Sequence, residues 1–388
     1  MPVSRAVLHF GSFKTGSTAI QESLFFRLRD PRFQYVSGGY SPNGSWLVEA
    51  LFHDPPESEN LYDFYGRPNG PFSAYRRNLE ERLERAARSA RENGRDVILS
   101  SEATWFAPRP VLERVRDHFA RRGFEPTVVG YLRPWSSWLP SFYQEDLKNG
   151  AAAFEPVLDI GHLREGRIVD VRSRIDTLFD VFGRERVSIL RFDPASFPDG
   201  CVVRHFCDRI GFRVPPDFRQ RSNEGLSLPA VQFLRAFNLA GGGYADRVVD
   251  RWKRASLIER DLQGVPGPRF RFHPSLVRSW LAEVPGQDEW LEREVGFGLE
   301  DASLEAALDD PDAVRREEDL AAFSEESLDW LAARTGGGKV RGSSTEETVR
   351  EVARRVSLLP GRVLPVRQVV RRLRIRAAYA WVHRRYGC

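Results

Sequence analysis

The chain has 388 residues, of which 41% are hydrophobic and 29% are charged, as is typical of a soluble globular protein with a large core. Its three cysteines are too few and too scattered for a disulfide framework or a zinc site, so we expect free thiols in a reducing compartment. The sequence contains neither a signal-peptide pattern nor an apolar run of 18 residues, and we therefore expect a cytoplasmic protein.

Short apolar runs bounded by turn or helix signals predict buried strands at 6–10, 96–100, 127–132 and 186–192. The segments between them have helical character, at 18–29, 74–93, 111–122, 136–148 and 171–182. Gly94, Gly123 and Gly183 each follow a helical pattern, where glycine commonly ends a helix. Alternating strands and helices predict an α/β fold, with a P-loop-like parallel sheet flanked by helices.

The strand signals fade after residue 240, and residues 241–334 predict a mainly helical C-terminal region. Residues 335–344 (TGGGKVRGSS) are typical of a Gly/Ser hinge, which begins a last segment at 335–388. Residues 339–388 carry a net charge of +10, whereas residues 1–338 carry −6. The basic tail either lies on an anionic membrane surface or engages an anionic acceptor, or it is a terminal helix packed on the domain.

The first predicted strand runs into a loop that resembles a phosphate-binding loop. Gly11 and Gly16 have the spacing of G-x-x-x-x-G-K-[ST], but Ser17 follows the second glycine and Lys14 lies inside the loop. Glycines let the backbone approach a phosphate, and the following helix adds a dipole that favours an anion. Ser17 and Thr18 supply hydroxyl groups and Lys14 a mobile charge. The alternative is a Gly-Ser turn that only caps a helix.

Ligands of parallel α/β sheets bind beyond the carboxyl ends of the strands, so the ends of the next two strands are also candidates. Glu102 follows the strand at 96–100 and is placed like a general base, unless it only caps the next helix. Arg133 ends the strand at 127–132, and Ser141 lies eight residues on, about two helical turns. These two side chains suit a second phosphate, although Arg133 has an alternative partner in Glu145.

The three strand ends together resemble the sulfotransferases that depend on 3′-phosphoadenosine 5′-phosphosulfate (PAPS), particularly the bacterial branch similar to carbohydrate sulfotransferases. The matching segments are H-x-G-x-x-K-T-G-S-T-x-x-Q at 9–21, S-S-E at 100–102, Y-L-R-P-x₆-S-x-Y at 131–143 and RSNEGLSLPAVQFLRAFN at 221–238. The resemblance covers about residues 5–240, which would form the PAPS-binding domain. Residues 241–334 would then be an extension that covers the acceptor site.

The resemblance also implies a role for each matching residue. The 5′-phosphosulfate would be bound by Gly11, Lys14, Thr15, Gly16, Ser17 and Thr18. Arg133 and Ser141 would bind the 3′-phosphate, and Glu102 would take the proton of the acceptor hydroxyl, while Lys14 stabilises the leaving oxygen. No metal is expected. The family also has a late basic loop near the adenine, for which GGGKVRG (336–342) is the one candidate in this sequence.

A member of this family would transfer a sulfuryl group to a hydroxyl or amine, which we expect to belong to a carbohydrate or glycolipid, with no nucleic-acid partner. Peripheral membrane contact is one of the alternatives that the basic tail of this chain leaves open. Two other interpretations stay open at the level of sequence. A P-loop kinase or ATPase is disfavoured by Ser17, which stands where lysine is needed, and by the lack of an aspartate after an apolar strand. A non-catalytic nucleotide-binding or scaffold protein is disfavoured by the presence of both Lys14 and Glu102.

Overall fold

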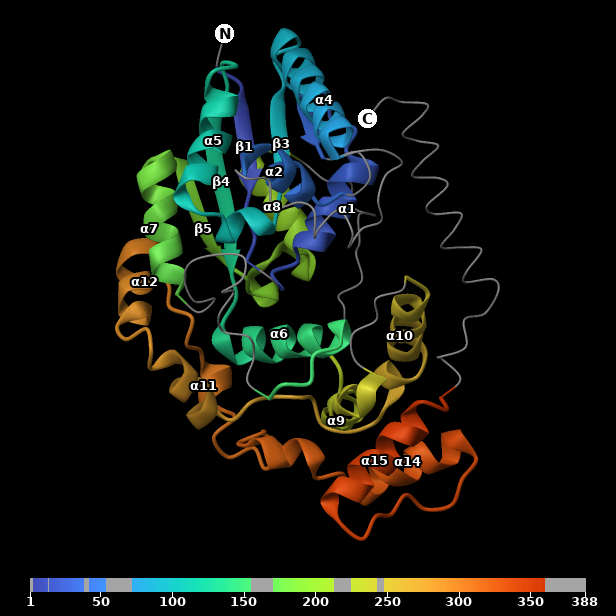
Figure 1. Ribbon diagram of the computed structural model, residues 1–388. Coiled ribbons are helices and arrows are strands. Elements are labelled where there is room, and N and C mark those ends of the chain that lie inside the picture. The colour runs from blue at the N-terminus through green and yellow to red at the C-terminus, as the bar shows by residue number, and fades with distance from the viewer. Residues whose placement is uncertain are drawn as a thin grey trace.

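A parallel sheet of five strands forms the centre of the computed structural model, in the order β2-β3-β1-β4-β5 (Figure 1). The structure describes residues 3–12, 14–37, 42–53, 72–154, 170–212, 225–242 and 248–359. The strands are β1 (Arg5–His9), β2 (Phe33–Val36), β3 (Asp96–Ser100), β4 (Glu125–Leu132) and β5 (Val187–Arg191), and every neighbouring pair is parallel. The predicted α/β fold with a parallel sheet is confirmed.

Helices cover both faces of the sheet. The helices between the strands and directly after the last one are α1 (Ser17–Arg27), α2 (Ser45–Phe52), α4 (Phe72–Glu92), α5 (Arg109–Ala120), α6 (Trp135–Asn149), α7 (Val171–Phe182) and α8 (Val202–Ile210). Alternate residues of β1 point to opposite faces, so that Ala6 and Leu8 pack in the core under α4, α5 and α7, whereas Val7 packs against α1 and α8. Because both faces of the sheet are covered by helices, residues that point to either face are apolar, and β1 is a continuous apolar run.

The C-terminal part of the described chain is helical, as predicted for 241–334, and two further helices, at 228–237 and 345–356, lie outside that range. Its helices are α9 (Leu228–Phe237), α10 (Val248–Arg260), α11 (Pro274–Leu281), α12 (Gln287–Val295), α13 (Ala302–Glu305), α14 (Glu325–Thr335) and α15 (Thr345–Val356). Figure 1 shows α6 crossing beyond the ends of the strands, with α9, α10, α14 and α15 further from the sheet. No helix of the described ranges is long and apolar enough to cross a membrane.

The four predicted strands and five predicted helices are all present, with boundaries shifted by at most two residues. Gly94 and Gly123 have φ of 61° and 77°, the left-handed conformation expected where a helix ends. The elements missed before residue 240 include β2, α2, α8 and the helix at 228–237. β2 is an edge strand of four residues, which is too short for its apolar pattern to stand out.

The strand order places the three predicted motifs next to one another. β1 lies between β3 and β4, and all three strands run in the same direction. The segments that follow them therefore emerge side by side at one edge of the sheet. These segments contain the loop at 11–18, Glu102 and Arg133.

Candidate functional site

The loop between β1 and α1 folds closely over the first turn of the helix. Gly16 precedes α1 with φ of 77°, a conformation that glycine adopts without strain. A Cβ at Gly16 would lie 2.8 Å from Val202 Cγ1, and a Cβ at Gly11 would lie 2.4 Å from Ser17 Oγ. At Gly16 both the backbone conformation and the contact disfavour a side chain, whereas at Gly11 the obstacle is the hydroxyl of Ser17.

The N-terminus of α1 has the polarity of an anion-binding site. Its N-cap residue is Gly16, which has no side chain to cap the helix, and its first turn contains no acidic residue. Because the first N–H groups of a helix have no partner within it, they can donate to an anion. Thr15 Oγ1 closes the loop from inside by donating to the carbonyl oxygen of Ser12 at 2.6 Å. Thr15 and Ser17 are buried, whereas Thr18 is exposed.

Lys14 is held at both its backbone and its side chain. Its φ of 63° is unusual for a residue with a Cβ. Its carbonyl oxygen accepts a hydrogen bond of 3.0 Å from Arg133 Nη1. Its Nζ lies 3.1 Å from Oε2 of Glu145 on α6. The lysine of the loop is therefore joined to the end of β4 and to the helix that follows it.

Glu102 lies between β3 and a short 3₁₀ helix (Ala103–Phe106) and does not cap that helix with its side chain. Burial raises the pKa of its carboxyl group above the ordinary value of 4.5. A hydrogen bond from Ser17 and the charge of Lys14 act in the opposite direction, while the charge of Glu145 adds to the increase. Glu102 is therefore in electrostatic contact with the loop, and a raised pKa suits a general base.

A row of hydrogen-bonded polar side chains ends at Glu102. Thr104 Oγ1 donates to Ser101 Oγ at 2.5 Å, and Ser101 Oγ donates to Ser45 Oγ at 3.3 Å. Ser45 donates both its N–H and its Oγ to Asn43 Oδ1, at 2.9 and 2.7 Å. This arrangement turns Asn43 Nδ2 toward Glu102 Oε2, at 3.5 Å. Asn43 was missed from the sequence, although Asn-Gly-Ser before an apolar segment is a recognisable helix start.

Arg133 lies beside the loop at the end of β4. Its Nε donates to Ser137 Oγ at 3.0 Å, and its guanidinium lies over the ring of Phe192, 5.5 Å from the centroid. Burial, together with the positive charge of Arg269, lowers its pKa to about 10. The guanidinium therefore remains charged at neutral pH. Glu145, its alternative partner from the sequence, pairs with Lys14 instead.

One face of α6 presents a polar stripe to the loop. Ser137, Ser141, Glu145 and Lys148 are spaced by four, four and three residues, which places them on the same side of a helix. The hydroxyl that contacts Arg133 belongs to Ser137, and the predicted Ser141 lies one turn further along this stripe. Glu145 and Lys148 were not predicted as site residues, because their approach to the loop depends on the direction of α6.

His9 is a buried neutral residue beneath the loop. Its Nδ1 shares a hydrogen bond of 2.7 Å with Ser100 Oγ, and burial lowers its pKa to about 3. Within the described part of the chain its Nε2 has no hydrogen-bond partner. This nitrogen lies 3.4 Å from the position that a Cβ of Gly11 would occupy. A proton acceptor of such low basicity does not compete with Glu102 for the role of base.

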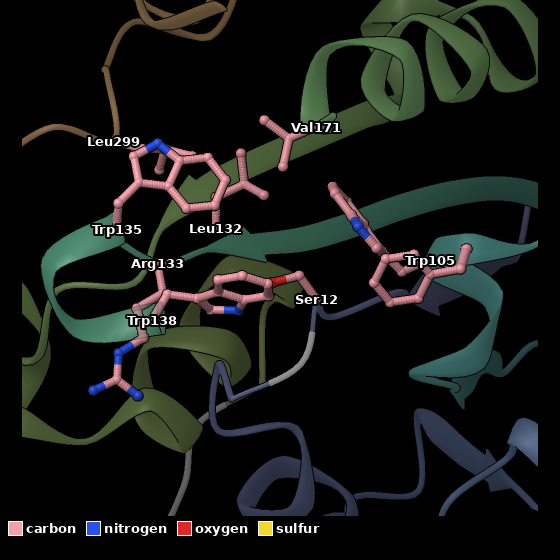
Figure 2. Close-up of a pocket in the computed structure, with 9 residues that line it drawn as sticks. Ser12, Trp105, Leu132, Arg133, Trp135, Trp138, Val171 and Leu299 are labelled. Atoms are coloured by element: carbon pink, nitrogen blue, oxygen red, sulfur yellow. The ribbon is translucent and has the colours of Figure 1, made fainter. Parts of the chain in front are cut away.

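A small pocket lined by aromatic side chains lies beside Ser12 of the loop and Arg133 (Figure 2). Figure 2 shows the indoles of Trp105, Trp135 and Trp138 around it, with Ser12 at its edge and the Arg133 guanidinium pointing outward. The three tryptophans are buried, as expected for core residues. The pocket is lined by Ser12, Trp105, Phe106, Leu132, Arg133, Trp135, Trp138, Val171 and Leu299.

The candidate late basic loop at 336–342 lies away from these residues. Gly338 in this segment accepts a hydrogen bond from Arg355 of α15, at the end of the molecule far from the sheet (Figure 1). The basic residue whose charge acts on Arg133 is Arg269. The first part of the fourth matching segment, 221–224, lies outside the described residues, while Leu226 donates its N–H to Gln144 Oε1 on α6 at 2.7 Å.

Comparison with known proteins gave weak structural matches, two of which are described here. No family model and no curated protein matches the sequence. A sulfotransferase from Alicyclobacillus acidocaldarius aligns with 67% of this chain and 98% of its own, at 17% identity and a TM-score of 0.36. The sulfotransferase domain from the curacin biosynthetic pathway aligns with 57% of this chain and 80% of its own, at 13% identity and a TM-score of 0.32. At these values, only the residues of the site can support a functional assignment.

Proposed function

We propose that this protein transfers a sulfuryl group from PAPS to a hydroxyl or amine of an acceptor, and that the acceptor is a carbohydrate or a glycolipid. One observation supports the proposal above the others. Lys14, Glu102 and Arg133 follow three adjacent parallel strands and surround the uncapped N-terminus of α1. This is the combination of an anion cradle, a base and a second anion site that such a reaction needs.

The loop residues suit the 5′-phosphosulfate of the donor. The backbone of 14–18 and the N–H groups of α1 would bind its oxygens, because no other side chain caps them. The close packing at Gly11 and Gly16 keeps this backbone in place before the ligand arrives. Such preorganisation removes part of the entropic cost of binding.

Arg133 and the serines of α6 suit the 3′-phosphate. The Arg133 guanidinium is already aligned by the carbonyl of Lys14 and by Ser137. Charged hydrogen bonds from arginine to phosphate are among the strongest in proteins. Arg269, whose charge reaches Arg133, would add a second positive group to this subsite.

Glu102 would accept the proton of the acceptor hydroxyl as the acceptor oxygen bonds to sulfur. Lys14 would neutralise the charge that develops on the bridging oxygen as the bond from sulfur to that oxygen breaks. Adenosine 3′,5′-bisphosphate is then the leaving group, and the acceptor leaves as a sulfate ester or sulfamate. A carboxylate base in this position is what suggests a sugar hydroxyl as the acceptor.

A nucleotide-binding panel tests the donor. Calorimetric titration should show binding of adenosine 3′,5′-bisphosphate without Mg²⁺, and far weaker binding of ATP with Mg²⁺. The reverse preference would instead support a P-loop kinase or ATPase. Transfer of ³⁵S-labelled sulfate from PAPS should then be measured on panels of glycans and glycolipids. Binding of the bisphosphate without transfer to any hydroxyl or amine would support a non-catalytic protein.

A further inference from the structure

We propose that Glu145 is a positioning residue that exchanges lysine partners during the reaction, holding Lys14 before the donor binds and Lys148 afterwards. Glu145 would thus release Lys14 to the leaving oxygen without leaving an uncompensated carboxylate beside an anionic donor. This inference rests on the sulfuryl transfer proposed above, since the donor is what draws Lys14 away.

The geometry around Glu145 supports the exchange. Glu145 Oε2 is 3.1 Å from Lys14 Nζ, and the two side chains are 43% and 28% exposed, so neither is locked in the core. Lys148 lies three residues after Glu145 on α6, a spacing that brings side chains together on one face of a helix. Glu145 therefore stands between Lys14 on the loop and Lys148 on its own helix.

The electrostatic interactions of Lys148 with Glu145 and Lys14 agree with the proposed exchange. Burial lowers the pKa of Lys148; the charge of Glu145 acts in the opposite direction, and the charge of Lys14 lowers the pKa further. Departure of Lys14 from Glu145 would remove this repulsion and leave the charge of Lys148 acting on Glu145. The chain has only four lysines against 54 arginines, and of these four Lys14 pairs with Glu145 while Lys148 interacts with it electrostatically.

Lysine suits the exchange better than arginine would. An ammonium group on a flexible stem can move between partners, whereas the planar guanidinium favours one fixed bidentate geometry. A half-exposed ion pair also costs little to break, about 1 kcal/mol or less. Lys14 can therefore leave Glu145 for a stronger, charge-assisted contact with the donor.

Two single variants test the exchange through the dissociation constant of adenosine 3′,5′-bisphosphate. Glu145→Gln should bind the bisphosphate about fivefold more tightly than the wild type, because Lys14 no longer has to leave a partner. Lys148→Gln should bind it about fivefold more weakly, because Glu145 then retains Lys14. The exposed residues Glu318 and Lys339 provide matched controls, and Glu318→Gln and Lys339→Gln should leave the constant unchanged.

The double variant separates the exchange from direct contact with the ligand. In the Glu145→Gln background, Lys148→Gln should have no effect on bisphosphate binding, so the two substitutions are not additive. If Lys148 touched the ligand itself, its loss would weaken binding equally in both backgrounds, which would overturn the proposal. Urea unfolding of the same variants shows whether a change in affinity reflects a damaged fold, and we expect equal unfolding free energies.

The NMR signals of the lysine side chains give a second measurement of the exchange. With only four lysines, the ¹³C-methylated protein should give a simple NMR spectrum, assigned by single Lys→Arg variants. Addition of adenosine 3′,5′-bisphosphate should shift the signals of both Lys14 and Lys148 in the wild type, but only that of Lys14 in Glu145→Gln. A Lys148 signal that never responds would refute the exchange and leave the proposed function standing. A wild type that does not bind the bisphosphate would refute both.

Discussion

Among single residues, Glu102 has the environment that defines its chemistry most clearly. Burial raises its pKa, and the carboxylate form is the one that accepts a proton. Activity should therefore fall as the pH drops through a value above 4.5, the ordinary pKa of glutamate. Glu102→Gln should lower kcat by about 10²- to 10⁴-fold and abolish this acidic limb.

The pH profile of kcat/KM and the dissociation constant of adenosine 3′,5′-bisphosphate check this prediction together. Glutamine keeps the size of the side chain, so binding of the bisphosphate should stay within about threefold of the wild type. Glu318→Gln, on the exposed surface, serves as the matched control. A Glu102→Gln enzyme with full turnover would contradict the assignment of the base.

Arg133 allows a prediction about recognition rather than turnover. Arg133→Gln should weaken binding of adenosine 3′,5′-bisphosphate by about 10- to 100-fold, as expected for the loss of a charged hydrogen bond. Binding of adenosine 5′-monophosphate, which lacks the 3′-phosphate, should change much less. Calorimetry of both ligands gives the ratio of affinities. A ratio that is unchanged from the wild type would assign the 3′-phosphate to other residues.

At the scale of elements, the start of α1 depends on the glycine that precedes it. Gly16→Ala introduces a Cβ 2.8 Å from Val202 and 3.2 Å from Phe192, at a φ of 77°. The backbone conformation alone costs alanine about 1–2 kcal/mol. The contacts add to this, so urea unfolding should show a larger loss of stability and bisphosphate binding should weaken.

A second glycine separates the two causes. Gly94 has a similar φ of 61°, but a Cβ there would meet nothing within 4 Å. Gly94→Ala should therefore show the backbone cost alone and leave binding of the bisphosphate intact. Equal losses of stability and binding in the two variants would mean that the close packing at Gly16 has no role in shaping the loop.

The sequence predicts the strand ends well but not the contacts between them. Lys14, Glu102 and Arg133 could be found because each follows a buried apolar strand, and parallel strands end at one edge. The ion pair of Lys14 with Glu145 joins residues 131 positions apart, and it depends on how α6 crosses the sheet. Asn43 depends on α2, a helix of only eight residues whose apolar character gives little periodicity.

At the scale of the whole molecule, the first part of the basic tail (339–388) contains α15, which is attached to the core. Val352, Ala353 and Val356 of α15 are buried, and Arg355 donates to Glu351, Thr335 and Gly338. The helix therefore belongs to the packed C-terminal region. Residues 360–388, which contain eight arginines and no acidic residue, lie outside the described part of the chain.

Deletion of residues 360–388 should separate the role of this basic segment from the role of the nucleotide site. The shortened protein should keep its affinity for adenosine 3′,5′-bisphosphate and lose binding to phosphatidylserine vesicles, because each basic residue near an anionic surface contributes about 1 kcal/mol. Sedimentation with vesicles at low and high salt measures the loss. Equal vesicle binding by the full and shortened chains would favour a tail that packs on the domain.

The polar row behind Glu102 has a direction. Each hydroxyl in it, from Thr104 through Ser101 to Ser45, donates its single proton toward Asn43, and the row ends in an amide nitrogen. An amide nitrogen donates hydrogen bonds and accepts none, so the row is a dead end for a proton that reaches Glu102. Under the proposed function, the proton that Glu102 accepts would therefore have to leave by another contact of the carboxyl group, such as the one with Ser17. Turnover would then depend on solvent reaching Glu102 from the side of the 11–18 loop after each transfer.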